Sequence, residues 1–127
     1  MPDRPDAPHL PRSAPIEAYG NGGFAFADMS HRGSLLCLPE AIWAWPVTAP
    51  EQINKASLDR VFASAKAIDT LIIGTGTGVW LAPSELRQAL RAVGVGLDTM
   101  QTGAAIRTYN IMMDERRRVA AALIAVP

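Results

Sequence analysis

Residues 94–127 constrain the fold most, because a strand, a helix and a second strand follow one another there. Residues 95–100 and 119–126 have the length of β-strands, and 119–126 is a continuous apolar run. The helix between them is expected to begin at an N-cap, Thr102, to end near Asp114, and to turn four apolar side chains inward: Ala105, Ile106, Tyr109 and Met113. This order predicts a right-handed crossover and at least partly parallel pairing.

The chain before this segment also alternates helices with strands. A helix is expected behind the N-cap Ser57, because apolar residues follow it at helical spacing. Residues 68–73 form a compact apolar strand that ends at Gly74. A second helix is expected over residues 83–93, with a proline in its first turn and Gly94 beyond its end.

The N-terminal half has a different pattern, with short strands and tight turns. Asn21 and Gly22 accept the positive φ of a hairpin turn, and Gly33 marks a second turn. This half is therefore expected to form an antiparallel meander with strands at residues 16–20, 24–29 and 34–38.

Length and composition favour a single domain over residues 16–127. Hydrophobic residues make up 49% of the chain, which suffices for one core. Twelve basic residues balance twelve acidic ones, which argues against a nucleic-acid binder. The only cysteine, Cys37, can form neither an internal disulfide nor a cysteine-cluster metal site. We expect it to be buried, and we expect the protein to be cytoplasmic.

The first fifteen residues contain five prolines among charged residues, so we expect a disordered tail there. This tail is interpreted as a solubilising extension. No apolar run elsewhere approaches the roughly 20 residues of a membrane helix, so no membrane insertion is expected.

A glycine-rich loop is the main candidate for ligand binding, and it consists of Gly74, Thr75, Gly76, Thr77 and Gly78. Glycines after a strand let backbone amides approach a phosphate or another anion. Asp98 also follows at roughly the distance of the ribose-binding acid in dinucleotide folds. The dinucleotide fingerprint nevertheless fails at Val79, where its third glycine belongs, and no Walker lysine is present. The loop can bind a nucleotide, bind another small anion, or simply be a turn that needs glycine.

Four polar residues near the last crossover complete this candidate site: Asp98, Thr99, Arg107 and Asn110. Asp98 and Thr99 lie at the carboxyl end of a strand, where open α/β sheets form sites, although Asp98 can equally brace neighbouring backbone. Arg107 can pair with that carboxylate or hold an anionic ligand. The Asn110 amide can tie the helix to the glycine loop. A structural role is the simpler interpretation of both Arg107 and Asn110.

The chain lacks the residue pattern of a nucleophilic or metal-dependent enzyme. Its two histidines, His9 and His31, fall in the tail and in a turn, so no Cys-His pair, Ser-His-Asp arrangement or metal cluster can be assembled. We therefore predict no catalytic residue, no metal site and no cofactor.

Two groups are candidates for contact with another protein. The first is the only basic run, Arg116, Arg117 and Arg118, which is either a solvated helix end or a partner contact. The second is a tryptophan face formed by Trp43 and Trp45, which lie two residues apart in an extended segment. Tryptophan and arginine often dominate interface energies.

Several of these residues carry a family resemblance. Residues 34–39 precede Trp45, the sequence Ile-Ile-Gly-Thr-Gly-Thr-Gly occupies residues 72–78, and Leu-Ala-Pro-Ser-Glu-Leu-Arg-Gln-Ala-Leu occupies 81–90. Asp98-Thr99 is followed by Ala-Ala-x-Arg-Thr-Tyr-Asn at 104–110, by Glu115-x-Arg117 and by the final strand. From residue 16 to the end, the chain resembles the Mth-type family of domains of unknown function.

Two positions depart from that family. Many members have cysteine where Ile106 stands and glycine where Arg116 stands. Any thiol role in the family would be lost here, and the turn before the last strand is expected to be built differently.

The resemblance implies a three-layer α/β domain with a central mixed sheet, flanking helices and an additional N-terminal antiparallel β layer. It implies no established catalytic activity. Relatives in the family include an adipogenesis-associated Mth domain-containing protein and an NDUFAF-type mitochondrial assembly factor for respiratory complex I. The resemblance therefore indicates protein interaction.

We expect a non-enzymatic protein that binds other proteins or assists the assembly of respiratory complex I or another membrane complex. A monomer or a weak homodimer is expected. The alternative is a small-molecule or anion-binding protein, or a weak enzyme, that uses the loop from Gly74 to Gly78 with Asp98, Arg107 and Asn110. A third possibility is a purely structural subunit of one fixed complex.

Overall fold

The computed structural model describes residues 8–127 and contains two β-sheets and three α-helices in that range. In chain order, the elements are β1 (Ala18–Gly20), β2 (Gly23–Phe26), β3 (Met29–Arg32), β4 (Ser34–Cys37), β5 (Ile42–Trp45), α1 (Asp59–Ala63), β6 (Thr70–Gly74), α2 (Ser84–Ala92), β7 (Gly96–Met100), α3 (Thr102–Asp114) and β8 (Val119–Leu123). Short 3-10 turns, Pro50–Gln52 and Ala65–Ala67, flank α1.

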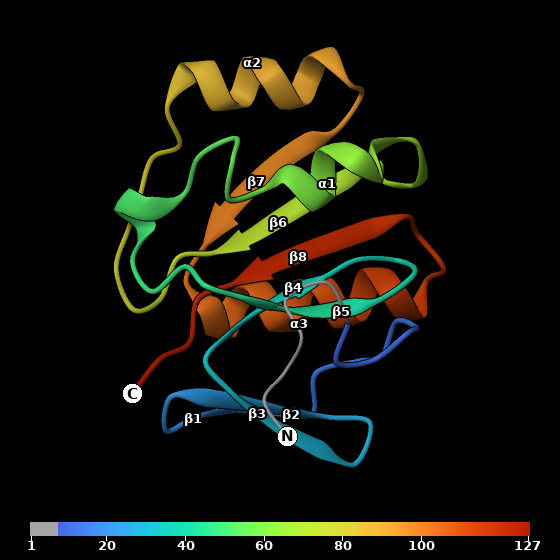
Figure 1. Ribbon diagram of the computed structural model, residues 1–127, viewed down its shortest axis with the longest axis vertical. Helices are drawn as coiled ribbons and strands as arrows, with labels where there is room; N and C mark the ends of the chain where they lie inside the picture. The colour runs from blue at the N-terminus through green and yellow to red at the C-terminus, as the bar shows by residue number, and fades with distance from the viewer. Residues whose placement is uncertain (1–7) are drawn as a thin grey trace.

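The central sheet has five strands in the order β5-β4-β8-β6-β7. β6 runs parallel to β7 and β8, whereas β4 runs antiparallel to β5 and β8. β1, β2 and β3 form a separate antiparallel sheet. The helices α1 and α2 cover one face of the central sheet, and α3 with the small sheet covers the other (Figure 1). The predicted three-layer fold with a mixed sheet and an N-terminal β layer is confirmed.

β8 shows why the core has two halves. All five of its residues are buried, and successive side chains point to opposite faces. Ala120 and Ala122 face the α1/α2 core, while Val119, Ala121 and Leu123 face the α3 core. A central strand with helices on both faces has no polar side, so it is a continuous apolar run.

The N-terminal half differs from the predicted meander in two ways. The predicted third strand, residues 34–38, is β4 and belongs to the central sheet, where it pairs with β5 and β8. The expected strand 24–29 is divided, because Ala27 and Asp28 adopt φ of 49° and 62° and form a tight turn between β2 and β3. The turn at Asn21 and Gly22, with φ of 51° and 78°, is confirmed. Alanine is an unusual residue in the left-handed region, so the sequence carried no signal for the second turn.

Two predicted helix caps are wrong by one residue. α1 follows Leu58, and Ser57 instead exchanges hydrogen bonds with Asn54. α3 follows Gln101, so Thr102 is its first helical residue. The inward side of α3 also includes Met112, which is 9% exposed, while the predicted Met113 is partly buried and packs against the same core. α2 (Ser84–Ala92) lies within the predicted range 83–93; Pro83 is its N-cap and not part of its first turn, and Gly94 lies beyond its end, as predicted.

The N-terminal segment contacts the rest of the domain where the structure describes it. Leu10 pairs with Ile42 at the outer edge of β5, and Ala14 is 3% exposed. These contacts place residues 10 and 14 against the rest of the domain, while the disordered tail over residues 1–15 stays a prediction. Residues 1–7, to which the same prediction applied, lie outside the described residues. In the described part of the chain, no helix has the length and apolar character to cross a membrane.

Candidate functional site

The glycine loop lies where an α/β sheet of this kind is expected to bind a ligand. The chain leaves β6 for α2 on one face of the sheet and leaves the neighbouring β7 for α3 on the other face. Ligand sites in open sheets form in the crevice between two such carboxyl ends. Here Gly74 ends β6 and Met100 ends β7, so both flank that crevice.

Hydrogen bonds within the chain close this crevice. The amide of Thr75 donates to the Met100 carbonyl (2.8 Å), and the amide of Gly76 donates to Oγ1 of Thr102 (3.0 Å). The same Thr102 hydroxyl donates to the carbonyl of Ile124 (2.8 Å). Two amides that an anion would need are therefore already used inside the protein.

Thr102 was predicted as a helix cap, and the structure assigns it a different role. Its side chain is fully buried and links the glycine loop to the segment after β8. Its backbone amide also donates to the Gly76 carbonyl (3.0 Å). The sequence offered no signal for this link, because the partners are 26 and 22 positions away.

Glycine is required at two loop positions for different reasons. Gly76 adopts φ of +90°, a region that disfavours other residues. A Cβ added to Gly74 would lie 3.0 Å from the Cα of Thr102, which is backbone and cannot move aside easily. These two glycines serve the turn and its close contact with α3.

The other ligand candidates are only partly brought together. Thr77 and Gly78 are exposed, and within residues 8–127 their amides donate no backbone hydrogen bond. Asp98 and Arg107 are both exposed, and no ion pair joins them in the described structure. Thr99 donates from Oγ1 to the Trp80 carbonyl at 3.4 Å. Anion binding at this loop stays a prediction.

Asn110 holds the N-terminal segment, whereas the sequence pattern suggested a link to the glycine loop. Its Oδ1 accepts from the Ile16 amide (3.0 Å), and its Nδ2 donates to the Ile16 carbonyl (2.8 Å). The side chain thereby pairs with backbone as a neighbouring strand would. It positions the chain just before β1 against α3.

An exposed apolar segment, residues 79–81, follows the glycine loop and was missed by the sequence analysis. Val79 is 89% exposed and Leu81 is 80% exposed, while Trp80 between them packs against the α1/α2 core. Apolar residues that project into solvent side by side mark interaction surfaces more often than isolated ones do. The available signal was an apolar Val-Trp-Leu run outside any periodic element.

The tryptophans predicted to contact a partner differ in accessibility. Trp45 is 4% exposed and donates from Nε1 to the Ser57 carbonyl (2.7 Å), so it offers no surface to a partner. Trp43 is half-buried beneath the guanidinium of Arg60, which lies 3.4 Å from the ring centre. The face formed by the two rings packs against the α1/α2 core.

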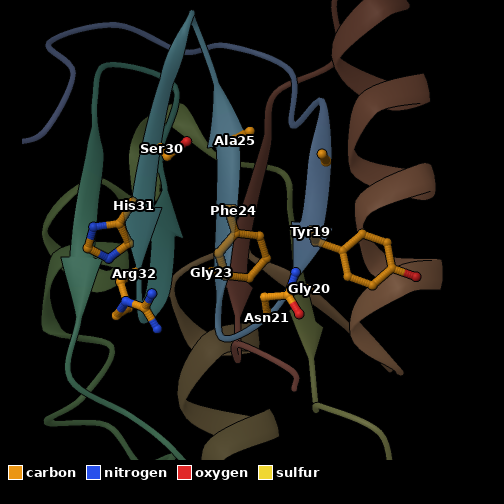
Figure 2. Close-up of a pocket in the computed structure, with 10 residues that line it drawn as sticks. Tyr19, Gly20, Asn21, Gly23, Phe24, Ala25, Ser30, His31 and Arg32 are labelled. Carbon is orange, nitrogen blue, oxygen red and sulfur yellow. The ribbon is translucent and has the colours of Figure 1, made fainter.

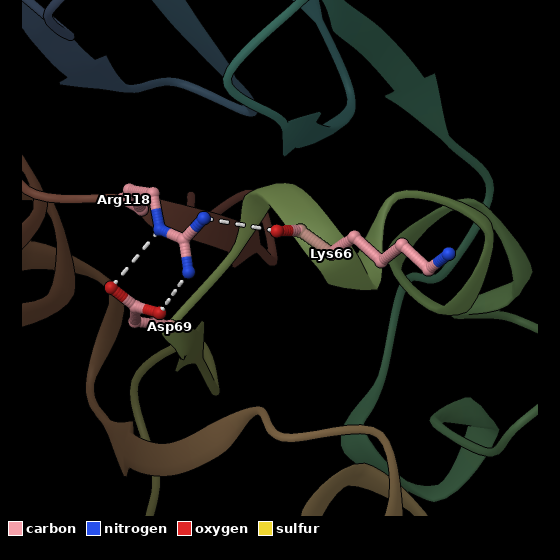
Figure 3. Close-up of polar contacts among 3 residues, drawn as sticks. All are labelled: Lys66, Asp69 and Arg118. Carbon is pink, nitrogen blue, oxygen red and sulfur yellow. Dashed lines mark hydrogen bonds and ion pairs between the residues drawn. The ribbon is translucent and has the colours of Figure 1, made fainter.

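The arginine run lies at the opposite end of the sheet from the glycine loop, because it precedes β8. Arg118 donates from Nε and Nη2 to the Asp69 carboxylate (3.2 and 2.6 Å) and from Nη1 to the Lys66 carbonyl (Figure 3). Arg117 lies 3.9 Å from Glu115. Arg116 has φ of +61°, the conformation that glycine prefers, so the turn keeps a glycine-like backbone.

Asp69→Asn is expected to destabilise the protein at pH 6 and to have a smaller effect at pH 2.5. The Arg118 hydrogen bond lowers the pKa of Asp69 below its usual 3.8, so the pair stabilises the fold above that pKa and is lost as the pH falls through the lowered value. Both side chains are largely exposed, so the effect should be small and should shrink in high salt. Urea unfolding at both pH values tests this, with Glu115→Gln as the control. An equal loss at both pH values would contradict it.

Cys37 is buried, as predicted, and its thiol contacts the Tyr109 hydroxyl. Burial raises the pKa of Cys37 to about 12 and also raises the pKa of Tyr109. The thiol is therefore protonated at neutral pH, which makes it a poor nucleophile and a poor metal ligand. Within the described residues no cluster of three or more candidate metal ligands occurs.

A shallow pocket of about 430 Å³ lies on the three-stranded sheet (Figure 2). Tyr19 extends from β1 toward α3, where an added Cβ on Gly103 would collide with its hydroxyl. Glycine at that position thus lets the tyrosine lie against the start of α3. None of the residues predicted to bind a ligand lines this pocket, so it adds nothing to the candidate site.

Comparison with known proteins identifies the family. A family model described as "Protein of unknown function (DUF498/DUF598)" matches residues 16–124. The chain belongs to this family. The chain is also similar to the solution structure of a Bordetella pertussis protein described as an Mth938-like domain. The identity is 28% and the TM-score is 0.78. The predicted Mth-type relationship is therefore confirmed. That match covers 98% of this chain and 92% of the Bordetella chain.

Two further solved structures are similar to the DUF498/DUF598 chain. A protein from Rhodopseudomonas palustris has 69% identity and a TM-score of 0.84, over 100% of this chain and 94% of that one. A protein from Bartonella henselae, described as an outer membrane protein, has 48% identity and a TM-score of 0.90, over 94% of this chain and 100% of that one.

Curated relatives of the DUF498/DUF598 chain include two kinds of protein. An uncharacterized protein from Rhodobacter capsulatus is 36% identical over 97% of this chain and 94% of its own length. NADH dehydrogenase [ubiquinone] 1 alpha subcomplex assembly factor 3 from Xenopus tropicalis is 33% identical over 86% of this chain. The match spans 60% of the length of that assembly factor. The relatives of this chain therefore include proteins named as assembly factors.

Proposed function

We propose that this protein is a cytoplasmic, protein-binding assembly factor for a membrane-bound NADH dehydrogenase, and that it contacts its partner through the exposed apolar segment, residues 79–81. The observation that carries the proposal is the exposure of Val79 and Leu81, at 89% and 80%, beside a loop whose Thr75 and Gly76 amides are already bonded internally. The name of the vertebrate relative supports the choice of partner.

The structure of the loop favours a docking role over anion binding. The exposed side chains of Val79 and Leu81 leave apolar surface in water, which is unfavourable in free energy. A partner that covers this surface removes that free-energy cost. The segment is held in place, because the Trp80 side chain packs into the core and its carbonyl accepts from Thr99. A held segment loses less conformational freedom on binding than a mobile loop does.

The double substitution Val79→Ser and Leu81→Ser is expected to remove partner binding while leaving the fold intact. The tagged chain would be expressed in its own cells, and NADH dehydrogenase subunits recovered with it would be quantified by mass spectrometry. We expect recovery to fall by about tenfold or more, because two apolar contacts are lost from the interface. The melting temperature should change little, since both side chains are exposed.

Ile111→Ser is the matched control, because Ile111 is an exposed apolar residue (59%) on α3, outside this segment. This control should leave recovery unchanged. Equal recovery with the wild type and the double variant would contradict the contact surface. Recovery of no NADH dehydrogenase subunit with the wild type would contradict the proposed partner.

A further inference from the structure

We propose that the open edge of β7 binds an acidic, extended segment of a partner protein as an added strand. The proposal rests on the proposed function and specifies which chemistry the partner presents. It arises from three observations: an unpaired strand edge, two arginines beside it, and the apolar segment at its end.

β7 is an outermost strand of the central sheet, next to β6 (Figure 1). The opposite outermost strand, β5, is covered by the chain itself, because Leu10 pairs with Ile42 there. Among the described residues, no segment pairs with the outer side of β7. An unpaired edge is a template for another strand.

The hydrogen bonds of β7 identify the backbone groups that point outward. The Gly96 amide donates to the Asp69 carbonyl (2.9 Å), and the Met100 carbonyl accepts from the Thr75 amide (2.8 Å), so both residues face the β6 side. Successive backbone groups of a strand point to alternate sides. The amides and carbonyls of Leu97 and Thr99 therefore point to the open edge, and an extended peptide can use them.

Two arginines give this edge its charge preference. Arg87 and Arg91 lie one turn apart on α2 and, with residues 94–97, line a cavity of about 350 Å³ beside β7. Both are exposed, and neither forms an ion pair in the part of the chain that the structure describes. A segment with acidic side chains on the α2 side would place carboxylates next to these guanidinium groups.

The α3 face of β7 determines which side chains of the added strand should not be acidic. Leu97 packs into the α1/α2 core, so the alternate residue Asp98 lies on the α3 face. Successive side chains of an added strand also alternate between the faces. Acidic residues at every second position fit the α2 side, whereas a carboxylate on the α3 side would meet Asp98. At the carboxyl end of β7, the Thr99 contact with Trp80 joins the edge to residues 79–81 and makes one continuous surface.

The test uses the full chain and two synthetic hexapeptides, Glu-Val-Glu-Val-Glu-Val and Lys-Val-Lys-Val-Lys-Val, both with blocked ends. Each is titrated into the isotopically labelled protein at low and high salt, and amide resonances are followed by NMR. We expect the acidic peptide to shift the Leu97 and Thr99 amides and to protect them from hydrogen exchange. The basic peptide should bind at least about tenfold more weakly, and salt should reduce the difference.

Three variants separate an edge site from non-specific attraction. Arg87→Glu with Arg91→Glu should weaken acidic-peptide binding by about tenfold or more. Arg116→Glu with Arg117→Glu changes the net charge equally at the far end of the sheet and should have no effect. Thr99→Pro removes an outward amide at an edge position, where proline is tolerated, and should abolish binding. If that variant fails to fold, the two charge-reversal pairs still decide the outcome.

The proposal is overturned if the Leu97 and Thr99 amides do not respond to the acidic peptide, or if both charge-reversal pairs weaken binding equally. Its failure is distinguishable from failure of the proposed function. Suppose that NADH dehydrogenase subunits are recovered normally with the Arg87→Glu, Arg91→Glu variant but are lost with the Val79→Ser, Leu81→Ser variant. This result would support the assembly role and reject the edge site.

Discussion

Thr102→Val is expected to lower the free energy of unfolding by about 2 to 4 kcal/mol. Valine keeps the shape of threonine but can neither accept the Gly76 amide nor donate to the Ile124 carbonyl. Gly76 and Ile124 are both buried, so the two groups lose their partner without gaining water. Each buried, unsatisfied backbone group costs about 1 to 3 kcal/mol.

Urea unfolding followed by tryptophan fluorescence measures this change, and hydrogen exchange at Gly76 localises it. Thr102→Ser is the matched control, because serine keeps the hydroxyl and removes only one methyl group, at a cost of about 1 kcal/mol. A valine variant as stable as the serine variant would show that the hydroxyl does not hold the loop. Faster exchange confined to Gly76 and its neighbours would identify the loop as the part released.

Asn110→Ala is expected to cost about 2 to 3 kcal/mol and to release the N-terminal segment. Both hydrogen bonds to Ile16 are lost, and Ile16 and Ala14 lose part of the contact that keeps them buried. Trypsin should then cut faster after the exposed Arg12, because residues before β1 detach more often. Urea unfolding gives the global change, and the rate of cleavage at Arg12 gives the local one.

Two control variants test the geometry of this contact. Arg107→Ala removes an exposed side chain one turn earlier on α3 and should change stability by less than about 0.5 kcal/mol. Asn110→Asp keeps the acceptor but turns a carboxylate oxygen toward the Ile16 carbonyl, which raises the pKa of the introduced carboxyl in the folded state. Its protonated form is then favoured by folding, so this variant should lose stability as the pH rises from about 4 toward neutrality. A flat profile would contradict the contact.

The Thr102 prediction bears on the site as well as on stability. Thr102 determines whether the glycine loop is closed, and the closed loop presents Val79 and Leu81 to solvent. We expect Thr102→Val to weaken partner binding even where the protein remains folded, because the segment after the loop is then less firmly held.

The order of strands and helices after residue 47 could be predicted from sequence, because periodicity and glycine or proline positions are local. Residues 95–100, 102–114 and 119–126 each carry their own pattern, and their succession limits the topology to a crossover of one hand. The burial of Cys37 and the glycine turn at Asn21 and Gly22 follow from residue type in the same way. The succession of these elements, the buried cysteine and the turn were confirmed because they need no knowledge of distant contacts.

The roles of the polar residues could be decided only by the tertiary structure. Asn110 bonds to Ile16, 94 positions away, and Thr102 bonds to a loop and a chain segment that approach it only after the sheet has formed. A polar side chain has the same local pattern whether it binds a ligand, caps a helix or satisfies distant backbone. The choice depends on which unsatisfied groups folding brings within about 3 Å of it, and that is a property of the assembled layers.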